Sequence, residues 1–360
     1  MNAPVIPRLA LLLIACVSSL APAQDVRIGV FGLFHPGELT VSSTTGSAVI
    51  LHAGAQTITL DASSSPYTAR IKAAGTGTVL EAGESSVNSR NITLTSRNGA
   101  PVDFVLSIPG KITRHYRGRL EISIVSGILV PVLVLDLESA VASVVAAESL
   151  PGTPIEELKA QAVATRSYFV AGKGRHQDFD FCDTTHCQFL RGVPERESPA
   201  FKAAVATRGL VITFESHIFA AMYTRSCSGH TRTPREVGLP VTSYPYFSVE
   251  CPFCRQRSVH WESRISAQDA SGLRVSDENA RLDTDRRLGW NTVQSDDFTM
   301  RREGKEVVLA GVGQGHAIGL CQAGAKAMAE QGSDFRHILA HYYPNTDFVR
   351  LKTIGATSIR

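Results

Sequence analysis

The chain has 360 residues, of which 43% are hydrophobic and 19% are charged, and its formal net charge is +3. This composition is that of a folded globular protein and excludes a disordered chain. The net charge is too small to indicate nucleic acid as a partner, although it is compatible with an anionic polymer. The length is sufficient for two domains, each with its own core.

The N-terminus has the pattern of a secretory signal peptide, which we place at residues 1–23. Arg8 precedes the apolar run 9–17, and Ala21-Pro-Ala23 provides a small-x-small cleavage site. Alternatively, Leu13-Ile-Ala-Cys16 resembles a lipobox, which would make a lipidated cysteine the mature N-terminus. Both interpretations predict export to the periplasm or the outside of the cell. No later stretch is apolar and long enough to cross a membrane as a helix.

The first part of the mature chain, residues 24–110, is predicted to be rich in β-strands. Short runs of alternating apolar residues are separated by clusters of Gly, Ser and Thr, as in strands joined by turns. The predicted strands lie at 26–34, 48–51, 56–60 and 91–95. This region contains no cluster of titratable residues, so we expect it to serve as a scaffold or docking module.

Two successive helices are predicted in the middle of the chain. The small-residue apolar run 137–147 suits the first helix. For the second, Thr153 is a good N-cap, Pro154 suits the first helical position, and Glu156 follows three residues after the cap, which together predict a capping box. Gly172 can terminate this second helix.

Glu148 lies at the C-terminal end of the first predicted helix. A carboxylate there meets the negative end of the helix dipole among apolar neighbours, and both effects raise its pKa. A carboxyl group that stays protonated near neutral pH can act as a general acid. The alternative interpretation is a solvated residue at the end of a helix, without a catalytic role.

The segment VVAAESLPGTPIEELKAQAVATRSYFVAG, residues 144–172, resembles the signature of the stage II sporulation protein D / amidase-enhancer family of bacterial cell-wall proteins. The resemblance extends from about Tyr116, in the YRGRLEI segment, to Thr346. It implies an α+β protein in which residues 111–360 form the catalytic domain. In this family, the glutamate that matches Glu148 is the catalytic acid of a lytic transglycosylase.

The reaction implied by the resemblance is cleavage of the β-1,4 bond between N-acetylmuramic acid and N-acetylglucosamine in peptidoglycan glycan strands. Most glycoside hydrolases need two carboxylates, whereas a lytic transglycosylase can work with one because the C6 hydroxyl of the sugar is the nucleophile. Two alternatives remain open: a non-catalytic amidase enhancer or wall-binding protein, whose partner is a cell-wall amidase, and a zinc peptidase or amidase.

Two imidazoles and two thiols lie within twelve residues of one another, at His176, Cys182, His186 and Cys187. This set matches tetrahedral zinc in ligand type and number, although the spacing is not that of a zinc finger. A disulfide between the two cysteines is an alternative. Some members of the family that this chain resembles bind zinc through the same pattern. With four protein ligands no position remains for water, so we predict a structural zinc ion.

The remaining cysteines of the mature chain form a second set, Cys227, Cys251, Cys254 and Cys321. The first and last of these replace hydroxyl residues in family motifs that should face one cleft. We therefore predict that all four lie close together. They would form two disulfides or, alternatively, a metal site with four thiolate ligands, and the sequence does not fix the pairing.

Segment 223–232 resembles the family motif HSTSGG, with Arg225 at the position of the histidine. Ser226 and Ser228 are therefore candidates for hydrogen bonds to sugar hydroxyls. They can equally be turn residues without a role in binding.

Segment 311–325 resembles the family motif G.GHG.GMSQ.GA. His316 and Gln322 are the substrate-binding candidates in it, and a structural histidine is the alternative for the first. The segment lacks the Lys-Ser/Thr of a phosphate-binding loop, so a nucleotide site is excluded.

The rest of the second half alternates helices with strands. We predict helices at 198–209, 322–331 and 335–344, strands at 210–214 and 218–223, and a polar, irregular structural segment at 261–298.

Overall fold

The computed structural model describes residues 25–237, 247–273, 275 and 278–351. The predicted signal peptide and the alternative lipobox lie outside the described residues. Within the described ranges, no helix has the length and apolar character needed to span a membrane.

The first half of the chain forms one large, mostly antiparallel sheet. Its path runs β12-β1-β11-β10-β9-β2-β5-β6-β7, and β3, β4 and β8 attach beside it. The strands are β1 (Asp25–Gly29), β2 (Glu38–Ser43), β3 (Val49–Ala53), β4 (Gln56–Leu60), β5 (Thr68–Ala74), β6 (Gly77–Ala82), β7 (Ser85–Ser89), β8 (Ile92–Thr95), β9 (Val102–Ile108), β10 (Ile112–Val125), β11 (Ile128–Asp136) and β12 (Phe181–Cys182). A short 3-10 helix, η1 (Gly32–Phe34), follows β1.

Alternation of apolar and polar side chains explains these strands. In β9 every second residue of the sequence VDFVLSI is buried, so one face packs on the core while the other faces outward. Strands β10 and β11 form a hairpin whose turn residues, Ser126 and Gly127, both have positive φ, as a tight hairpin turn requires. β10 pairs with β9, and β11 pairs with β1. The hairpin of β10 and β11 is therefore part of the large sheet.

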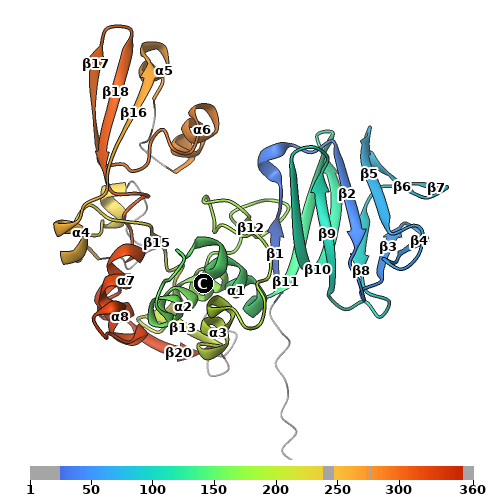
Figure 1. Ribbon diagram of the computed structural model, residues 1–360, viewed down its shortest axis with the longest axis horizontal. Helices are drawn as coiled ribbons and strands as arrows, with labels where there is room; N and C mark the ends of the chain where they lie inside the picture. The colour runs from blue at the N-terminus through green and yellow to red at the C-terminus, as the bar shows by residue number, and fades with distance from the viewer. Residues whose placement is uncertain (1–24, 238–246, 274, 276–277, 352–360) are drawn as a thin grey trace, which may run out of the picture.

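A group of helices comes after the sheet in the chain and lies beside it (Figure 1). Helices α1 (Leu137–Glu148), α2 (Ile155–Ala171) and α3 (Pro199–Ala206) contact one another. β13 (Leu210–Phe214) lies against α2 and pairs with β14 (His217–Ile218) and β20 (Asp347–Arg350). α7 (Gln322–Glu330) and α8 (Phe335–Tyr342) contact each other and also pack on α2. Because neighbours surround it, α2 is buried along most of its length.

Helix α1 ends at Glu148, as predicted. Gly172 is the C-cap of α2, as predicted, and its N–H donates a hydrogen bond to the Tyr168 carbonyl. The predicted capping box is wrong. The N-cap of α2 is Pro154, and the Thr153 hydroxyl donates to the Leu150 carbonyl instead.

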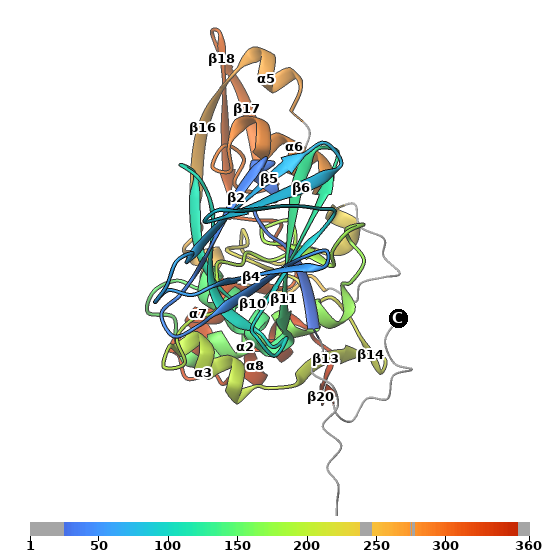
Figure 2. The ribbon, with the colours of Figure 1, turned by 90° about the vertical axis from the view of Figure 1, so that its right-hand side faces the viewer.

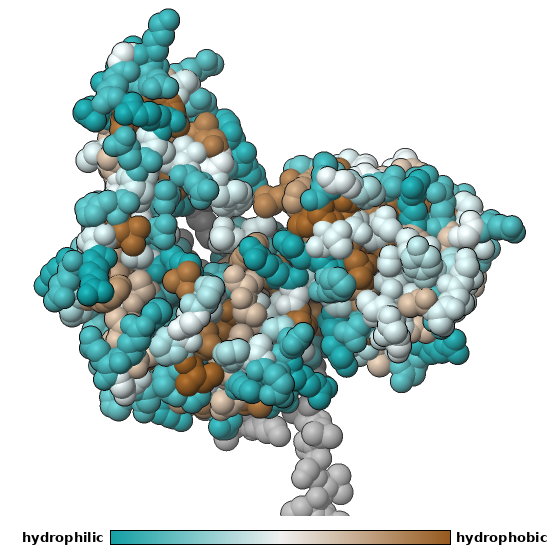
Figure 3. All heavy atoms as spheres, viewed as in Figure 1, coloured by the Kyte–Doolittle hydropathy of each residue, from teal (hydrophilic) through white to brown (hydrophobic). Residues whose placement is uncertain are grey.

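The third part of the molecule is an extension built on a three-stranded sheet of β16 (His260–Ser266), β18 (Glu306–Val312) and β17 (Phe298–Glu303), with α5 (Ala267–Ser271) and α6 (Glu278–Leu288) beside it. It stands away from α1 to α3 in both ribbon views (Figures 1 and 2). Its small core contains Trp261, Ile265, Val293, Val307 and Leu309. The predicted irregular segment 261–298 is therefore wrong in part, since it contains most of β16 and two helices. The outer surface of the extension is largely hydrophilic (Figure 3).

Shorter elements join these parts: α4 (Pro252–Gln256), the 3-10 helix η2 (Pro234–Val237), and β15 (Tyr223–Thr224), which pairs in parallel with β19 (Leu320–Cys321). The predicted α+β class, with a β-rich first part and a mixed second part, is confirmed.

Candidate active-site cleft and cysteine clusters

A cleft of about 530 Å³ lies between several parts of the chain. It is lined by the end of α1, by the loop that follows β12, by strand β15, by the extension and by the segment before α7. Its walls include Glu148, Gln188, Tyr223, Arg225, Arg281, Trp290, His316 and Gln322. Segments far apart in the sequence thus meet around the predicted catalytic glutamate.

Glu148 is partly buried at the last residue of α1, and its carboxyl lines the cleft. Burial raises the pKa of this carboxyl above its usual value, and the backbone N–H of Phe189, the Tyr223 hydroxyl and Arg225 partly offset that rise. The N–H of Phe189 donates to Oε1 at 2.7 Å and so fixes the orientation of the carboxyl group. The geometry therefore gives an oriented carboxyl that holds its proton to a higher pH than an exposed glutamate does.

Two side chains stabilise the C-terminal end of α1 at the same residue. Arg225 Nη1 donates to the Glu148 carbonyl at 2.9 Å, and Gln322 Nε2 lies 3.5 Å from the same oxygen. A cation at the C-terminus of a helix interacts favourably with the helix dipole and satisfies a free carbonyl. Arg225, which stands where the family motif has histidine, thus positions the backbone of the glutamate.

His316 and Gln322, the two candidates from segment 311–325, both line the cleft. The environment of the histidine sets its protonation. Its Nδ1 accepts a hydrogen bond from the Ile318 N–H at 2.9 Å, which leaves Nε2 as the protonated nitrogen of the neutral ring. Burial, together with nearby arginines that include Arg281 and Arg232, lowers the pKa of His316 to about 4. The imidazole is therefore neutral at pH 7 and unsuited to act as a cationic acid.

Ser226 and Ser228 are not among the residues that line the cleft. Ser226 is 3% exposed, and its hydroxyl lies 3.5 Å from Cys254 Sγ. The Ser226 hydroxyl thus lies beside the cysteines, and the predicted contact of the two serines with sugar hydroxyls stays a prediction.

The extension contributes cleft residues that the sequence analysis missed. Asp296 forms ion pairs with Arg281 and with Arg232, the latter at 3.5 Å. Trp290 lines the cleft and is 39% exposed. A tryptophan in a polar segment was the signal that could have identified this wall, since a large aromatic side chain far from any apolar run often serves a binding site.

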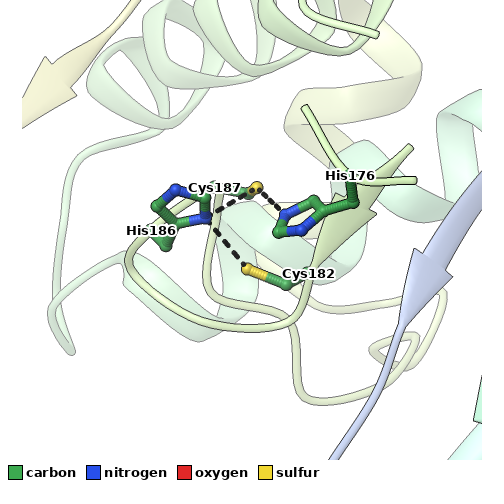
Figure 4. Close-up of side chains that lie close together, drawn as sticks. All are labelled: His176, Cys182, His186 and Cys187. Carbon is green, nitrogen blue, oxygen red and sulfur yellow. Dashed lines mark hydrogen bonds between the residues drawn. The ribbon is translucent and has the colours of Figure 1, made fainter. Parts of the chain in front are cut away.

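The side chains of His176, Cys182, His186 and Cys187 converge in the loop that follows α2 (Figure 4). His186 Nδ1 lies 3.6 Å from each sulfur, and His176 Nε2 lies 3.3 Å from Cys187 Sγ. A tetrahedral zinc ion with ordinary Zn–N and Zn–S bonds separates its nitrogen and sulfur ligands by about 3.6 Å. These four residues could therefore hold a metal ion, and the spacing fits zinc.

The second cysteine set also comes together. The sulfurs of Cys227, Cys251, Cys254 and Cys321 all lie within 4.8 Å of one another. All six described cysteines are free, so neither the alternative bridge between Cys182 and Cys187 nor a disulfide within the second set is present in the structure.

Comparison with known proteins shows what this chain is similar to. Residues 127–214 match the family model described as stage II sporulation protein. Stage II sporulation protein D of Bacillus amyloliquefaciens is 24% identical over 259 residues, which cover 59% of this chain and 74% of the relative. The predicted resemblance to the stage II sporulation protein D family is confirmed.

Two further relatives show how the similarity is distributed. An uncharacterized protein of Brachyspira hyodysenteriae is 27% identical over 269 residues, 65% of this chain and 72% of the relative. The amidase enhancer of Bacillus subtilis is 39% identical over 59 residues, 16% of this chain and 8% of the relative. The segment matched by the stage II sporulation protein model includes Glu148 and the group of His176, Cys182, His186 and Cys187, called the His/Cys set below. The group of Cys227, Cys251, Cys254 and Cys321, called the four-cysteine set, and the extension lie beyond that segment.

Proposed function

We propose that this chain is an exported lytic transglycosylase that cleaves the β-1,4 bond between N-acetylmuramic acid and N-acetylglucosamine in peptidoglycan. The observation that carries the proposal is the Glu148 carboxyl, which lines a cleft, is oriented by the Phe189 N–H and has a raised pKa. These are the properties of a general acid.

Glu148 would first donate its proton to the glycosidic oxygen as the bond to the leaving sugar breaks. The resulting carboxylate would then accept the proton of the C6 hydroxyl, whose oxygen attacks C1 of the same N-acetylmuramic acid residue. The product is a 1,6-anhydro end, and no water is consumed. Proton donation and uptake by one group balance over the two steps, so one carboxylate suffices.

Another carboxylate of the cleft, Asp296, is ion-paired with Arg281 and Arg232 and so holds the wall together. Asp285 lies 3.9 Å from Arg281, but burial still raises its pKa to about 6. Among the described residues, no ion pair of the Glu148 carboxyl is found, which leaves it available as the acid.

Substrate contacts would come from opposite walls of the cleft. The neutral His316 ring and the Gln322 amide offer donors and acceptors for sugar hydroxyl and N-acetyl groups. Trp290 offers an exposed aromatic face on which a sugar ring can stack.

His176, Cys182, His186 and Cys187 would hold a zinc ion with no open coordination position, so the ion would be structural. Phe189, which orients Glu148, follows Cys187 by two residues. The ion would therefore fix the loop that presents the N–H to the catalytic carboxyl. This ligand set gives no support to a zinc peptidase, which needs a coordinated water.

The test is Glu148→Gln in the full chain, assayed on purified glycan strands with and without stem peptides. We expect 1,6-anhydro ends, detected by mass spectrometry, to form at least about 100-fold more slowly, because an amide cannot donate an acidic proton. The wild-type rate should fall as the pH rises through the elevated pKa of Glu148. A folded variant that retains more than about a tenth of the wild-type rate would rule out this role.

The match to an amidase enhancer favours a second candidate function, stimulation of a cell-wall amidase. Both forms of the chain should then be added to such an amidase acting on intact peptidoglycan. Stimulation that persists in Glu148→Gln, with no anhydro ends from either form, would identify the non-catalytic function.

A further inference from the structure

We infer that Cys227, Cys251, Cys254 and Cys321 bind one zinc ion through four thiolates, and that this ion joins the two loops that hold Glu148 in place. The site is separate from the His/Cys set and lies outside the segment matched by the family model. The inference does not depend on glycan cleavage.

The size of the cluster fits a single ion. All four sulfurs lie within 4.8 Å of one another, and Cys254 Sγ lies 3.5 Å from Cys321 Sγ. Tetrahedral zinc with ordinary Zn–S bonds separates its sulfurs by about 3.8 Å. A cluster of several iron atoms would need its cysteines further apart, so the space suits one tetrahedral ion.

Disulfide pairing explains the arrangement less well. A disulfide brings two sulfurs to about 2.05 Å and gives no reason for two bridges to meet at one point. Here each sulfur is close to the other three, and the four side chains share one buried position, at no more than 1% exposure. Mutual proximity of all four is what a central ion requires.

Polar groups are placed around the sulfurs as they are around metal-bound thiolates. The backbone N–H of Cys227 donates to Cys321 Sγ at 3.3 Å. The Ser226 hydroxyl lies 3.5 Å from Cys254 Sγ, and the Tyr342 hydroxyl lies 3.5 Å from Cys251 Sγ. Donors of this kind offset the negative charge of a tetrathiolate site and orient its ligands.

The backbone around the site is shaped to admit the sulfurs. A Cβ atom on Gly324 would lie 2.5 Å from Cys251 Sγ and 2.0 Å from the Tyr342 hydroxyl. Only glycine leaves room on α7 for both groups. Cys251 and Cys254 come from the start of α4, Cys227 from the loop after β15, and Cys321 from β19.

The ion would connect the supports of Glu148. Arg225 lies two residues before Cys227, Gln322 directly follows Cys321, and both side chains reach the Glu148 carbonyl. β15 and β19 pair at Thr224 and Cys321 and bring these loops together. Loss of the ion would release both contacts at the end of α1.

The deciding experiment uses Cys182→Ser, which removes a ligand of the His/Cys set and leaves the four-cysteine set intact. Protein purified without chelator should contain one zinc per chain by elemental analysis. After exchange with Co²⁺, its absorption should show the strong thiolate charge-transfer bands and d–d spectrum of a four-sulfur tetrahedral site. Wild-type chain should contain two zinc ions.

Cys227→Ser is the matched variant at the proposed site, and we expect it to lose the four-sulfur spectrum and one zinc per chain while keeping the spectrum of a two-sulfur, two-nitrogen site. If Cys227→Ser does not fold, the zinc content and the Co²⁺ spectrum of Cys182→Ser still test whether the four-cysteine set binds an ion. The proposal is overturned if Cys182→Ser contains no metal, or if mass spectrometry of the alkylated wild-type chain finds a disulfide between any two of the four cysteines.

Discussion

Glu157 is a buried acid on α2 that the proposed reaction does not use. Its side chain is 2% exposed, and burial raises its pKa to about 8, against the opposing effects of Arg225 and Lys326. A carboxyl with this pKa is mostly protonated at pH 7. It therefore lies in the folded chain as a neutral group, which avoids the cost of an unpaired buried charge.

This burial predicts a pH-dependent stability. The pKa of Glu157 is raised from 4.5 to about 8 on folding, so its contribution is fully present below pH 4.5 and is lost as the pH rises toward 8. The loss is about 1.4 kcal/mol for each pH unit in this window. Glu157→Gln should flatten the dependence and stabilise the chain at pH 8, as measured by urea unfolding.

The exposed Glu84→Gln is the control for that measurement and should leave the pH dependence unchanged. An unaltered slope in Glu157→Gln would show that Glu157 is ionised in the folded chain.

At the scale of single residues, the sequence singled out Glu148, which lines the cleft, and the two groups of side chains that converge, because each of these residues lies in a compact motif. It could not tell which side of its loop Ser226 faces, since that depends on the cysteines packed behind the loop. Trp290 was missed because its partners in the cleft come from distant segments.

The packing of helices α1, α2 and α3 depends on one buried ion pair. Arg166 is fully buried on α2, and two of its nitrogens donate to the Glu138 carboxylate at 2.7 and 3.0 Å. The same guanidinium also donates to the carbonyls of Ala204 on α3 and Leu210 on β13. One side chain thus satisfies acceptors from three other elements, α1, α3 and β13.

We expect Glu138→Gln to destabilise the chain by about 3–5 kcal/mol, because it leaves the Arg166 charge buried without its partner. Glu197→Gln provides the matched control, since the pair of Glu197 with Lys202 is exposed and should change the free energy of unfolding by less than about 1 kcal/mol. Urea unfolding of both variants measures the difference. Equal, small effects would show that Arg166 is held by its backbone partners alone.

At the scale of elements, local patterns predicted α1 and α7 closely, because a helix with periodic apolar residues and a distinct end carries its own signal. The capping box at Thr153 failed because tertiary structure used its parts elsewhere: the Glu156 carboxylate accepts the N–H of Phe335 at the start of α8, at 2.9 Å. Local preference is a weak guide where a distant partner competes for the same group.

At the scale of the whole molecule, the loop that carries the His/Cys set joins the N-terminal sheet to the cleft. Within this loop, Phe181 and Cys182 of β12 pair in parallel with Ile28 and Gly29 of β1, so the loop is attached to the N-terminal sheet. Further along, the N–H of Phe189 reaches Glu148 on α1. The sequence analysis could not predict this connection, because the pairing joins residues about 150 positions apart.

This connection makes the His/Cys set the link between scaffold and cleft. Cys182→Ser should lower the melting temperature by several degrees, because it removes a ligand from the proposed zinc site, and a structural metal site contributes to folding. It should also lower kcat more than it raises KM, because the Phe189 N–H loses its fixed position at Glu148 while Trp290, which lines the cleft from the extension, is not changed. Thr184→Val, in the same loop, is the control, since Thr184 contacts Cys182 but supplies no ligand. Calorimetry measures the melting temperature, and initial rates on glycan strands give kcat and KM. If both the melting temperature and kcat of Cys182→Ser are unchanged, the loop holds its position without the ion.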